Sequence, residues 1–256
     1  MFIKTKQHEV DDFNEELSNS WLKIPNTTSH AESYIFAIQE QEIKTRALQK
    51  SREYKHDNTY DTRCRHCHLA KEDIFHLLAS CGSLSTSLYL PVRHDEVGKI
   101  LFNELVKEDD PESPYIIPKN EIWKSDKSEI WWDTSIETTP KTRHNKPDII
   151  LWRKEEKECK IIDICIPLEE NVKSNEKLKK DRYVQLSIGL KRLYPVYTFS
   201  MIPIVLGLTG LITNSLQTYL SELFNQNKVK SIIPKLQQKA LLGSMRVIKS
   251  AMTLRK

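Results

Sequence analysis

The sequence predicts a protein that contains both helices and strands, of the α/β class in its mixed α+β form. We expect a sheet with both parallel and antiparallel strands, flanked by helices. Two observations in the second half of the chain predict this class. Apolar runs typical of strands occur at 148–153, 159–166 and about 197–206, and a helical pattern at 172–194 separates the last two. This order favours one sheet covered by helices. The runs are nearly continuous rather than alternating, as in strands covered on both faces.

Changes in composition along the chain divide it into four expected regions. Residues 1–28 are polar and poorly patterned, which indicates a poorly ordered N-terminal remnant. Residues 29–106 form a helical region with a candidate metal site. Three prolines and four acids crowd into 107–119, so we expect a linker there. Residues 120–256 hold the predicted sheet and end in basic helices.

Helix signals are clearest in the first half of the chain. Ser29 and Glu32 form a capping box, and the good helix formers that follow predict one long helix as far as residue 52. Residues 88–106 predict a turn followed by a short amphipathic helix. The apolar side of that helix consists of Val97, Ile100, Leu101 and Leu105.

The strongest chemical signal is the run CRHCHLAKEDIFHLLASC. Its order is C-x-x-C, eight residues, His, four residues, Cys, which lets a tight turn and a following helical segment close four soft donors into one tetrahedron. The predicted zinc ligands are Cys64, Cys67, His76 and Cys81. His66, His68 and His94 are alternative ligands, although the spacing of His76 fits better.

The cysteine count also bears on the compartment. Five cysteines are an odd number, and three of them cluster beside a histidine, so a metal site explains them better than disulfides and we expect an intracellular protein. No signal-peptide core is evident, and the most apolar stretch, 201–212, is too short to span a bilayer. We therefore expect no membrane partner.

Asp148 and Asp163 lie in the first two predicted strands. A hairpin turn centred between Glu155 and Glu156 would pair them directly, with Cβ atoms roughly 4.5–5.5 Å apart. Like charges opposed in apolar surroundings are unfavourable unless a cation lies between them. The pair therefore indicates a catalytic Mg²⁺ or Mn²⁺ site. The alternative is that the register differs by a residue or two and one Asp is exposed.

A lysine continues the apolar stripe of the next helical segment. The stripe consists of Tyr183, Leu186, Leu190 and Leu193, and Lys179 lies one turn before it. Lys179 could contact a scissile phosphate or orient the attacking water, with Arg182 as a second phosphate contact. Alternatively, Lys179 belongs to a solvated row of charges with Lys177 and Lys180.

Basic residues elsewhere indicate contacts with a nucleic-acid backbone. The net charge is +4, and residues 225–256 contain eight Lys or Arg but no Asp or Glu. A solvated helix face is the alternative for this tail. The candidate nucleic-acid-binding residues are Arg143, His144, Lys146, Lys180, Lys239, Arg246 and Lys249.

From about Ser29 to the end, the chain resembles the C-terminal region of non-LTR retrotransposon proteins that carry a restriction-like endonuclease and insert site-specifically. The matching stretches are AIQEQEIKTR, CRHC with HLLASC, VRHDEVGKIL, HNKPDI, IIDICIP, EKLKKDRY, PIVLGLTGLI and KALLGSMRVIKS. The resemblance implies a zinc knuckle that helps place nucleic acid. It also implies a PD-(D/E)xK nuclease whose metal-binding acids are Asp148 and Asp163 and whose displaced lysine lies near Tyr183.

In such elements the nuclease nicks target DNA to prime reverse transcription, so the implied partners are DNA and the element RNA, and the implied location is nuclear. Cys165 occupies the position where the standard pattern has lysine, so activity would depend on Lys179 or a neighbour. The chain has no Tyr-x-Asp-Asp polymerase core, and we expect a detached fragment that does not polymerise. The alternatives are an inactive nucleic-acid-binding module and a degenerate fragment. The oligomeric state stays open.

Overall fold

The computed structural model describes residues 12–25, 27–118 and 122–253. These residues form a five-stranded open sheet in the order β1-β2-β3-β4-β5. Strands β1 to β4 are antiparallel neighbours, whereas β5 runs parallel to β4. The predicted mixed sheet flanked by helices is confirmed. The strands are β1 (Ile122–Lys124), β2 (Ser128–Trp132), β3 (Ile149–Arg153), β4 (Glu158–Cys165) and β5 (Thr198–Val205).

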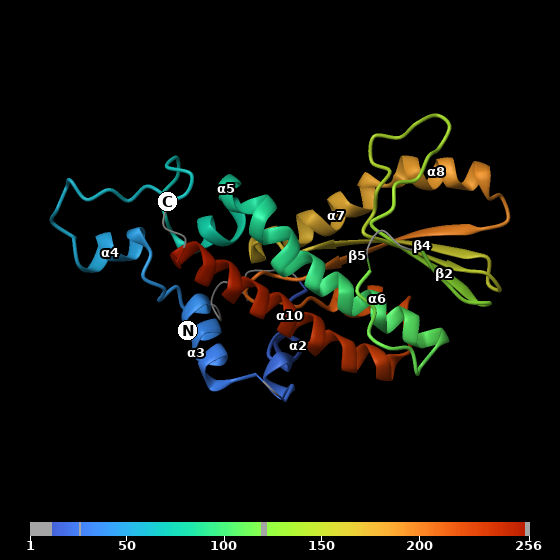
Figure 1. Cartoon of the computed structure of the whole chain (residues 1–256), viewed down its shortest axis with the longest axis horizontal. Coiled ribbons are helices and arrows are strands. Elements are labelled where there is room, and N and C mark those ends of the chain that lie inside the picture. Colours follow the sequence, from blue (N-terminus) through green and yellow to red (C-terminus); the bar gives the residue numbers. More distant parts are fainter. Residues whose placement is uncertain (1–11, 26, 119–121, 254–256) are drawn as a thin grey trace.

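Helices cover both faces of this sheet. In Figure 1, α6 and α10 run side by side across one face, whereas α7 and α8 lie on the other. The longer helices are α3 (Ser29–Gln39), α6 (Asp95–Asp109), α7 (Val172–Arg182), α8 (Val184–Leu193), α9 (Asn214–Ser221) and α10 (Gln226–Thr253). The short α-helices and the 3-10 and π-helical segments are α2 (Glu15–Ser18), η1 (Ser20–Lys23), α4 (Arg46–Arg52), η2 (His76–Ser80), α5 (Gly82–Leu84), η3 (Ser85–His94) and η4 (Glu169–Asn171).

The two faces of β3 contribute to two different cores. Ile149 and Leu151 belong to the main core, which includes the apolar sides of α6 and α10. Ile150 and Trp152 belong to a smaller core that includes Leu186 of α8. Successive side chains of a strand point to opposite faces, so these buried runs follow from coverage on both sides, as predicted.

The β3–β4 hairpin has the predicted register. Ile149 pairs with Ile162 and Arg153 pairs with Glu158. The two residue numbers of each pair add up to the same value, as expected for a turn centred between residues 155 and 156. Asp148 and Asp163 follow this register one position beyond the last pair of the ladder. By alternation they belong to the face covered by α7 and α8.

The single long helix predicted from Ser29 is wrong, because the segment forms α3 and α4. The N-cap of α3 is Thr28, whose side chain accepts a hydrogen bond from the backbone N–H of Ala31. Gln41 adopts a positive φ of 60°, and the N–H of Glu42 donates to the carbonyl oxygen of Ala37. This is a Schellman C-cap in which a glutamine takes the position usually held by glycine.

Two other segments also differ from the prediction. The helical pattern at 172–194 is divided into α7 and α8 at Tyr183, whose backbone lies outside the helical region. The expected turn before α6 is η3, a π-helical segment that contains Pro91. Strands β1 and β2 were not predicted. They extend the sheet beyond β3 on its antiparallel side.

The chain before Thr28 packs against α10 where it is described. Trp21 is 1% exposed, and Gln237 of α10 accepts hydrogen bonds from the Trp21 amide and the Ser20 hydroxyl. Residues 1–11 of the predicted N-terminal remnant lie outside the described residues. The main core contains residues from both sides of the predicted linker, such as Leu101 and Ile164. The division into two domains at 107–119 stays a prediction.

Candidate functional site

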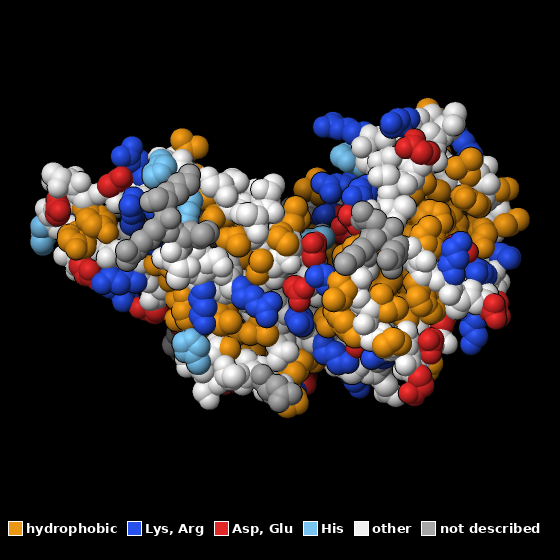
Figure 2. All heavy atoms as spheres, viewed as in Figure 1, with side chains coloured by type: hydrophobic (Ala, Val, Ile, Leu, Met, Phe, Trp, Pro, Cys, Tyr) orange, Lys and Arg blue, Asp and Glu red, His pale blue; other side chains and the backbone are white. Residues whose placement is uncertain are grey.

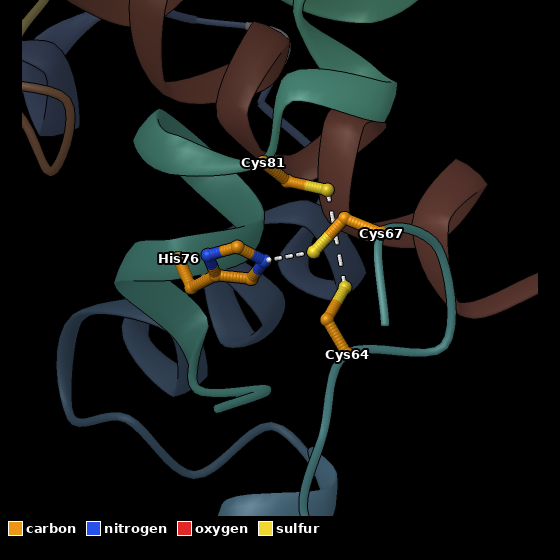
Figure 3. A group of neighbouring side chains, drawn as sticks. All are labelled: Cys64, Cys67, His76 and Cys81. Atoms are coloured by element: carbon orange, nitrogen blue, oxygen red, sulfur yellow. Dashed lines mark hydrogen bonds between the residues drawn. The ribbon is translucent and has the colours of Figure 1, made fainter. Parts of the chain in front are cut away.

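The four predicted zinc ligands converge in the structure (Figure 3). One donor atom from each of Cys64, Cys67, His76 and Cys81 lies within 4.8 Å of the others. The sulfur atoms of Cys64 and Cys81 are 3.8 Å apart, and the sulfur of Cys67 is 3.3 Å from Nε2 of His76. Tetrahedral zinc–sulfur bonds of about 2.3 Å require sulfur atoms about 3.8 Å apart. The cluster could therefore hold a metal ion such as zinc.

Local hydrogen bonds favour the thiolate form of Cys67, whereas burial and the neighbouring Cys64 raise the pKa of Cys81 to about 12. Burial opposes ionisation of Cys67, but hydrogen bonds from the backbone amides of Ala70 and Leu69 outweigh it and lower the pKa of the thiol to about 6. The amide of His66 likewise lies 3.4 Å from the sulfur of Cys64. Metal ions bind the thiolate rather than the thiol, so the C-x-x-C turn is organised for metal binding.

The alternative ligands His66 and His94 have other partners. Nε2 of His66 lies 2.7 Å from the carbonyl oxygen of Ala251, near the end of α10. The cluster is therefore attached to the C-terminal helix. His94 lies instead beside Asp148, where its Nε2 is 3.2 Å from Oδ2 of the carboxylate.

Asp148 is held in place from two parts of the fold. Its Oδ2 accepts a hydrogen bond from the backbone N–H of Ile164 on β4 at 2.6 Å, in addition to the contact with His94. Burial opposes its ionisation, but the charge of His94 outweighs burial and lowers the pKa of Asp148. The carboxylate is thus anionic at neutral pH. Both contacts use Oδ2, so neither engages Oδ1.

Asp163 is held from the α7–α8 side. Its Oδ1 accepts a hydrogen bond from the hydroxyl of Tyr183 at 3.1 Å. Its Oδ2 is 2.5 Å from Nζ of Lys179 and 3.9 Å from the guanidinium of Arg182. Burial and the nearby charge of Asp148 raise the pKa of Asp163, and Lys179 opposes that shift. The structure therefore brings together all four residues predicted as catalytic.

Sequence reasoning missed the part that His94 takes in this arrangement. Burial would lower its pKa, but the carboxylates of Asp148 and Asp95 outweigh burial and raise the pKa of His94 to about 10. The side chain is therefore an imidazolium at neutral pH. Sequence reasoning treated His94 as an alternative zinc ligand, and its place in the stretch VRHDEVGKIL is far from Asp148 along the chain.

These groups line a pocket of about 340 Å³ at the open end of the β3–β4 hairpin, opposite its turn. Figure 2 shows Lys and Arg side chains gathered beside a hollow at the upper edge of the molecule. The polar and charged side chains that line the pocket are Tyr89, Arg93, His94, Lys146, Asp148, Asp163, Cys165, Lys179, Arg182 and Tyr183.

The candidate nucleic-acid-binding residues are dispersed. Arg143 and His144 are exposed on the loop before β3, and Lys146 lines the pocket and pairs with Asp133 at 2.8 Å. Lys180 lies over the ring of Tyr219.

The candidate nucleic-acid-binding residues on α10 are Lys239, Arg246 and Lys249, and they face the N-terminal half of the chain. Lys239 is 3.6 Å from Glu96, whose pKa is lowered by the charges of Lys99, Lys239 and Arg246 in spite of burial. Nζ of Lys249 lies 3.1 Å from Nε2 of His30. Lys239 and Lys249 thus have local partners, and Arg246 is exposed.

No known protein-family profile matches the chain, and no curated protein shows significant similarity to it. Within the described residues, no helix is both long and apolar enough to cross a membrane.

Proposed function

We propose that this chain is a metal-dependent DNA endonuclease domain of retrotransposon origin, with a PD-(D/E)xK-type core and a zinc knuckle that helps place nucleic acid. One observation carries the proposal: Asp148, Asp163 and Lys179 meet in a single pocket although they come from three different elements. That set consists of two acids and one basic residue, as the nuclease pattern requires. Lys179 approaches from α7 because Cys165 occupies the usual position of the lysine.

The proposal assigns a catalytic Mg²⁺ or Mn²⁺ to the two carboxylates of the pocket. Magnesium sites in phosphoryl-transfer enzymes use one or two protein carboxylates together with substrate phosphates and water, and Asp148 and Asp163 would be those carboxylates. Oδ2 of Asp163 is buried and accepts no hydrogen bond of good geometry from the described residues, although Lys179 lies beside it. A metal ion there would bind beside Lys179 or in its place, and Oδ1 of Asp148, which takes neither of that carboxylate's two contacts, would be a second ligand atom. A bound metal would activate water and stabilise charge on the phosphate.

The other pocket residues supply binding and orientation. His94 and the Ile164 amide fix the carboxylate of Asp148, and Tyr183 fixes that of Asp163. Lys179 and Arg182 place two positive charges beside Asp163, where a phosphate group would enter. Preorganised cations of this kind stabilise negative charge that develops during phosphodiester cleavage.

A second candidate is a nucleic-acid-binding module without nuclease activity. The observation that favours it is that both carboxylates already have cationic partners, His94 for Asp148 and Lys179 for Asp163. Cations that neutralise the acids reduce the need for a metal ion. In that case the pocket would bind phosphate through its basic residues alone.

A nicking assay on supercoiled plasmid with Mg²⁺ or Mn²⁺ distinguishes the two candidates. The wild-type chain should nick, and Asp148→Asn should not, while both should retard DNA equally in a gel. Asp126→Asn is the matched control, because Asp126 is exposed between β1 and β2 and does not line the pocket. Retardation without nicking by the wild type would support the binding module, and nicking by Asp148→Asn at the wild-type rate would reject the proposed site.

A further inference from the structure

Arg93 is the one cation of the pocket without a carboxylate partner in the described parts of the chain. Lys146 pairs with Asp133, His94 with Asp148, and Lys179 with Asp163. The guanidinium of Arg182 also lies 3.9 Å from Asp163.

The side chain of Arg93 is buried in spite of its charge, with 4% of the residue exposed. Its Nη2 donates to the carbonyl oxygen of Leu78 at 3.0 Å, its Nη1 lies 3.4 Å from the hydroxyl of Ser244, and its guanidinium lies over the ring of Tyr89. All three partners are neutral. A buried charge without a counter-ion is unfavourable, and burial lowers the pKa of Arg93 to about 10.

Glu169 is a carboxyl group whose charge acts on Arg93. Its Oε1 accepts hydrogen bonds from the amide and the hydroxyl of Thr209, and burial raises its pKa. No ion pair joins it to Arg93 in the described structure. Arg93 therefore makes no ion pair with a carboxylate among the described residues, and it lines a pocket that also contains Lys179 and Arg182.

We propose that Arg93 forms an anion subsite in this pocket and binds a phosphate group directly. The contacts with Leu78 and Ser244 engage two of the five guanidinium N–H groups, and the others match phosphate oxygens as donors. The neighbouring cations favour a dianion or a polyanion over a single carboxylate. The subsite deepens the proposed function, on which it rests for its biological role, because it would hold a backbone phosphate of the nucleic acid. Its binding of phosphate needs no divalent metal ion.

Titration calorimetry on the zinc-loaded full chain, without added Mg²⁺, tests the subsite with inorganic phosphate as the probe. Arg93→Met should weaken phosphate binding by about tenfold or more, the loss expected for one charge-assisted contact. The matched control is Arg153→Met, because Arg153 also donates to a backbone carbonyl, that of Leu223, and does not line the pocket. Its effect should stay below about twofold.

Phosphate affinity equal to that of the wild type in Arg93→Met, or no saturable phosphate binding by the wild type, would overturn the subsite. Should Arg93→Met fail to fold, Arg93→Lys keeps the charge and loses the planar fork, and unchanged affinity in that variant would count equally against it. A second titration uses a short single-stranded oligonucleotide without terminal phosphates. If Arg93→Met weakens binding of the oligonucleotide more than Arg153→Met does, the ligand is a backbone phosphate. If Arg93→Met weakens binding of inorganic phosphate alone, the ligand is the free anion.

The subsite and the nuclease can fail separately. Asp148→Asn should lose nicking and keep its affinity for phosphate. Phosphate binding that depends on Arg93 in a wild-type chain that never nicks would reject the nuclease and retain the subsite. Nicking by Arg93→Met with unchanged KM, together with unchanged phosphate affinity, would retain the nuclease and reject the subsite.

Discussion

Nε2 of His94 lies 3.2 Å from Oδ2 of Asp148, although 54 residues separate the two in the sequence. His94 directly precedes α6, and Asp148 directly precedes β3. This contact brings a residue from the helical region after the Cys/His cluster into the carboxylate pair. The candidate nuclease pocket therefore depends on both halves of the chain.

Replacement of His94 should destabilise the fold. In His94→Asn, the carboxylate of Asp148 keeps only the Ile164 amide of its two donors, and loss of a charged hydrogen bond to a buried group costs about 1–3 kcal/mol. Urea denaturation at pH 7 measures the difference in unfolding free energy. The exposed His144→Asn should change it by less than about 0.5 kcal/mol. Equal stability of the two variants would show that the contact with Asp148 is energetically unimportant.

Under the proposed function, Lys179 is the basic residue that acts at the phosphate. The sequence could not separate four neighbouring candidates, namely Lys177, Lys179, Lys180 and Arg182. Of these four, only Lys179 makes a close ion pair with Asp163, and Lys177 is exposed. Lys179→Met should lower the nicking rate by about 10²–10³, typical of the loss of one preorganised donor. Lys177→Met, which removes the same charge from the same helix, should nick within about twofold of wild type. Similar losses in both variants would point to a general charge effect instead.

Loss of a metal ion bound by the Cys/His cluster should loosen the end of α10. Cys67→Ser should reduce zinc content well below the expected value of about one ion per chain, as measured by elemental analysis of the purified protein. Because His66 contacts the carbonyl oxygen of Ala251, amide hydrogen exchange near residues 245–253 should accelerate in the same variant. Cys159→Ala alters a buried cysteine outside the cluster and should keep its zinc. Full zinc occupancy in Cys67→Ser would remove this residue from the ligand set.

Local patterns predicted the parts of the site that depend on local geometry. The C-x-x-C spacing placed two sulfur ligands on one turn, and the constant index sum of a hairpin placed Asp148 opposite Asp163. Both inferences needed only the backbone geometry of a short segment. The ion pair of Lys179 with Asp163 was not predicted, because sequence reasoning assigned Lys179 to a scissile phosphate or to a solvated row of charges.

Other features depend on long-range packing, which one sequence does not reveal. His94 meets Asp148 because it ends η3 directly before α6, and α6 packs against β2, the neighbour of β3 in the sheet. The strands β1 and β2 are short and lie in a polar stretch that contains tryptophans, so no strand pattern was recognised there. The break after α3 uses Gln41 with positive φ, so the glycine signal that commonly marks a helix end was absent.

Glu104 should link α6 to α10 in a pH-dependent way. Its carboxylate lies 2.5 Å from Nζ of Lys228 and 2.7 Å from Nζ of Lys235, and only 8% of the residue is exposed. Burial opposes its ionisation, but the two lysines outweigh burial and lower the pKa of Glu104 from 4.5. A lowered carboxyl pKa contributes stability that is present above pH 4.5 and is lost as the pH falls through the folded-state pKa.

Glu104→Gln should therefore destabilise the protein at pH 7 by about 1–3 kcal/mol, because two lysines lose their shared counter-ion. Urea denaturation at a series of pH values from 7 to about 4 measures the difference from wild type, which should begin to shrink only below pH 4.5, as protonation of wild-type Glu104 removes the same charge. Glu108→Gln is the control, because it removes an exposed carboxylate from the same helix and should have an effect of less than about 0.5 kcal/mol. A difference between Glu104→Gln and wild type that stays constant down to pH 4 would indicate that packing of the side chain, rather than its charge, holds α6 against α10.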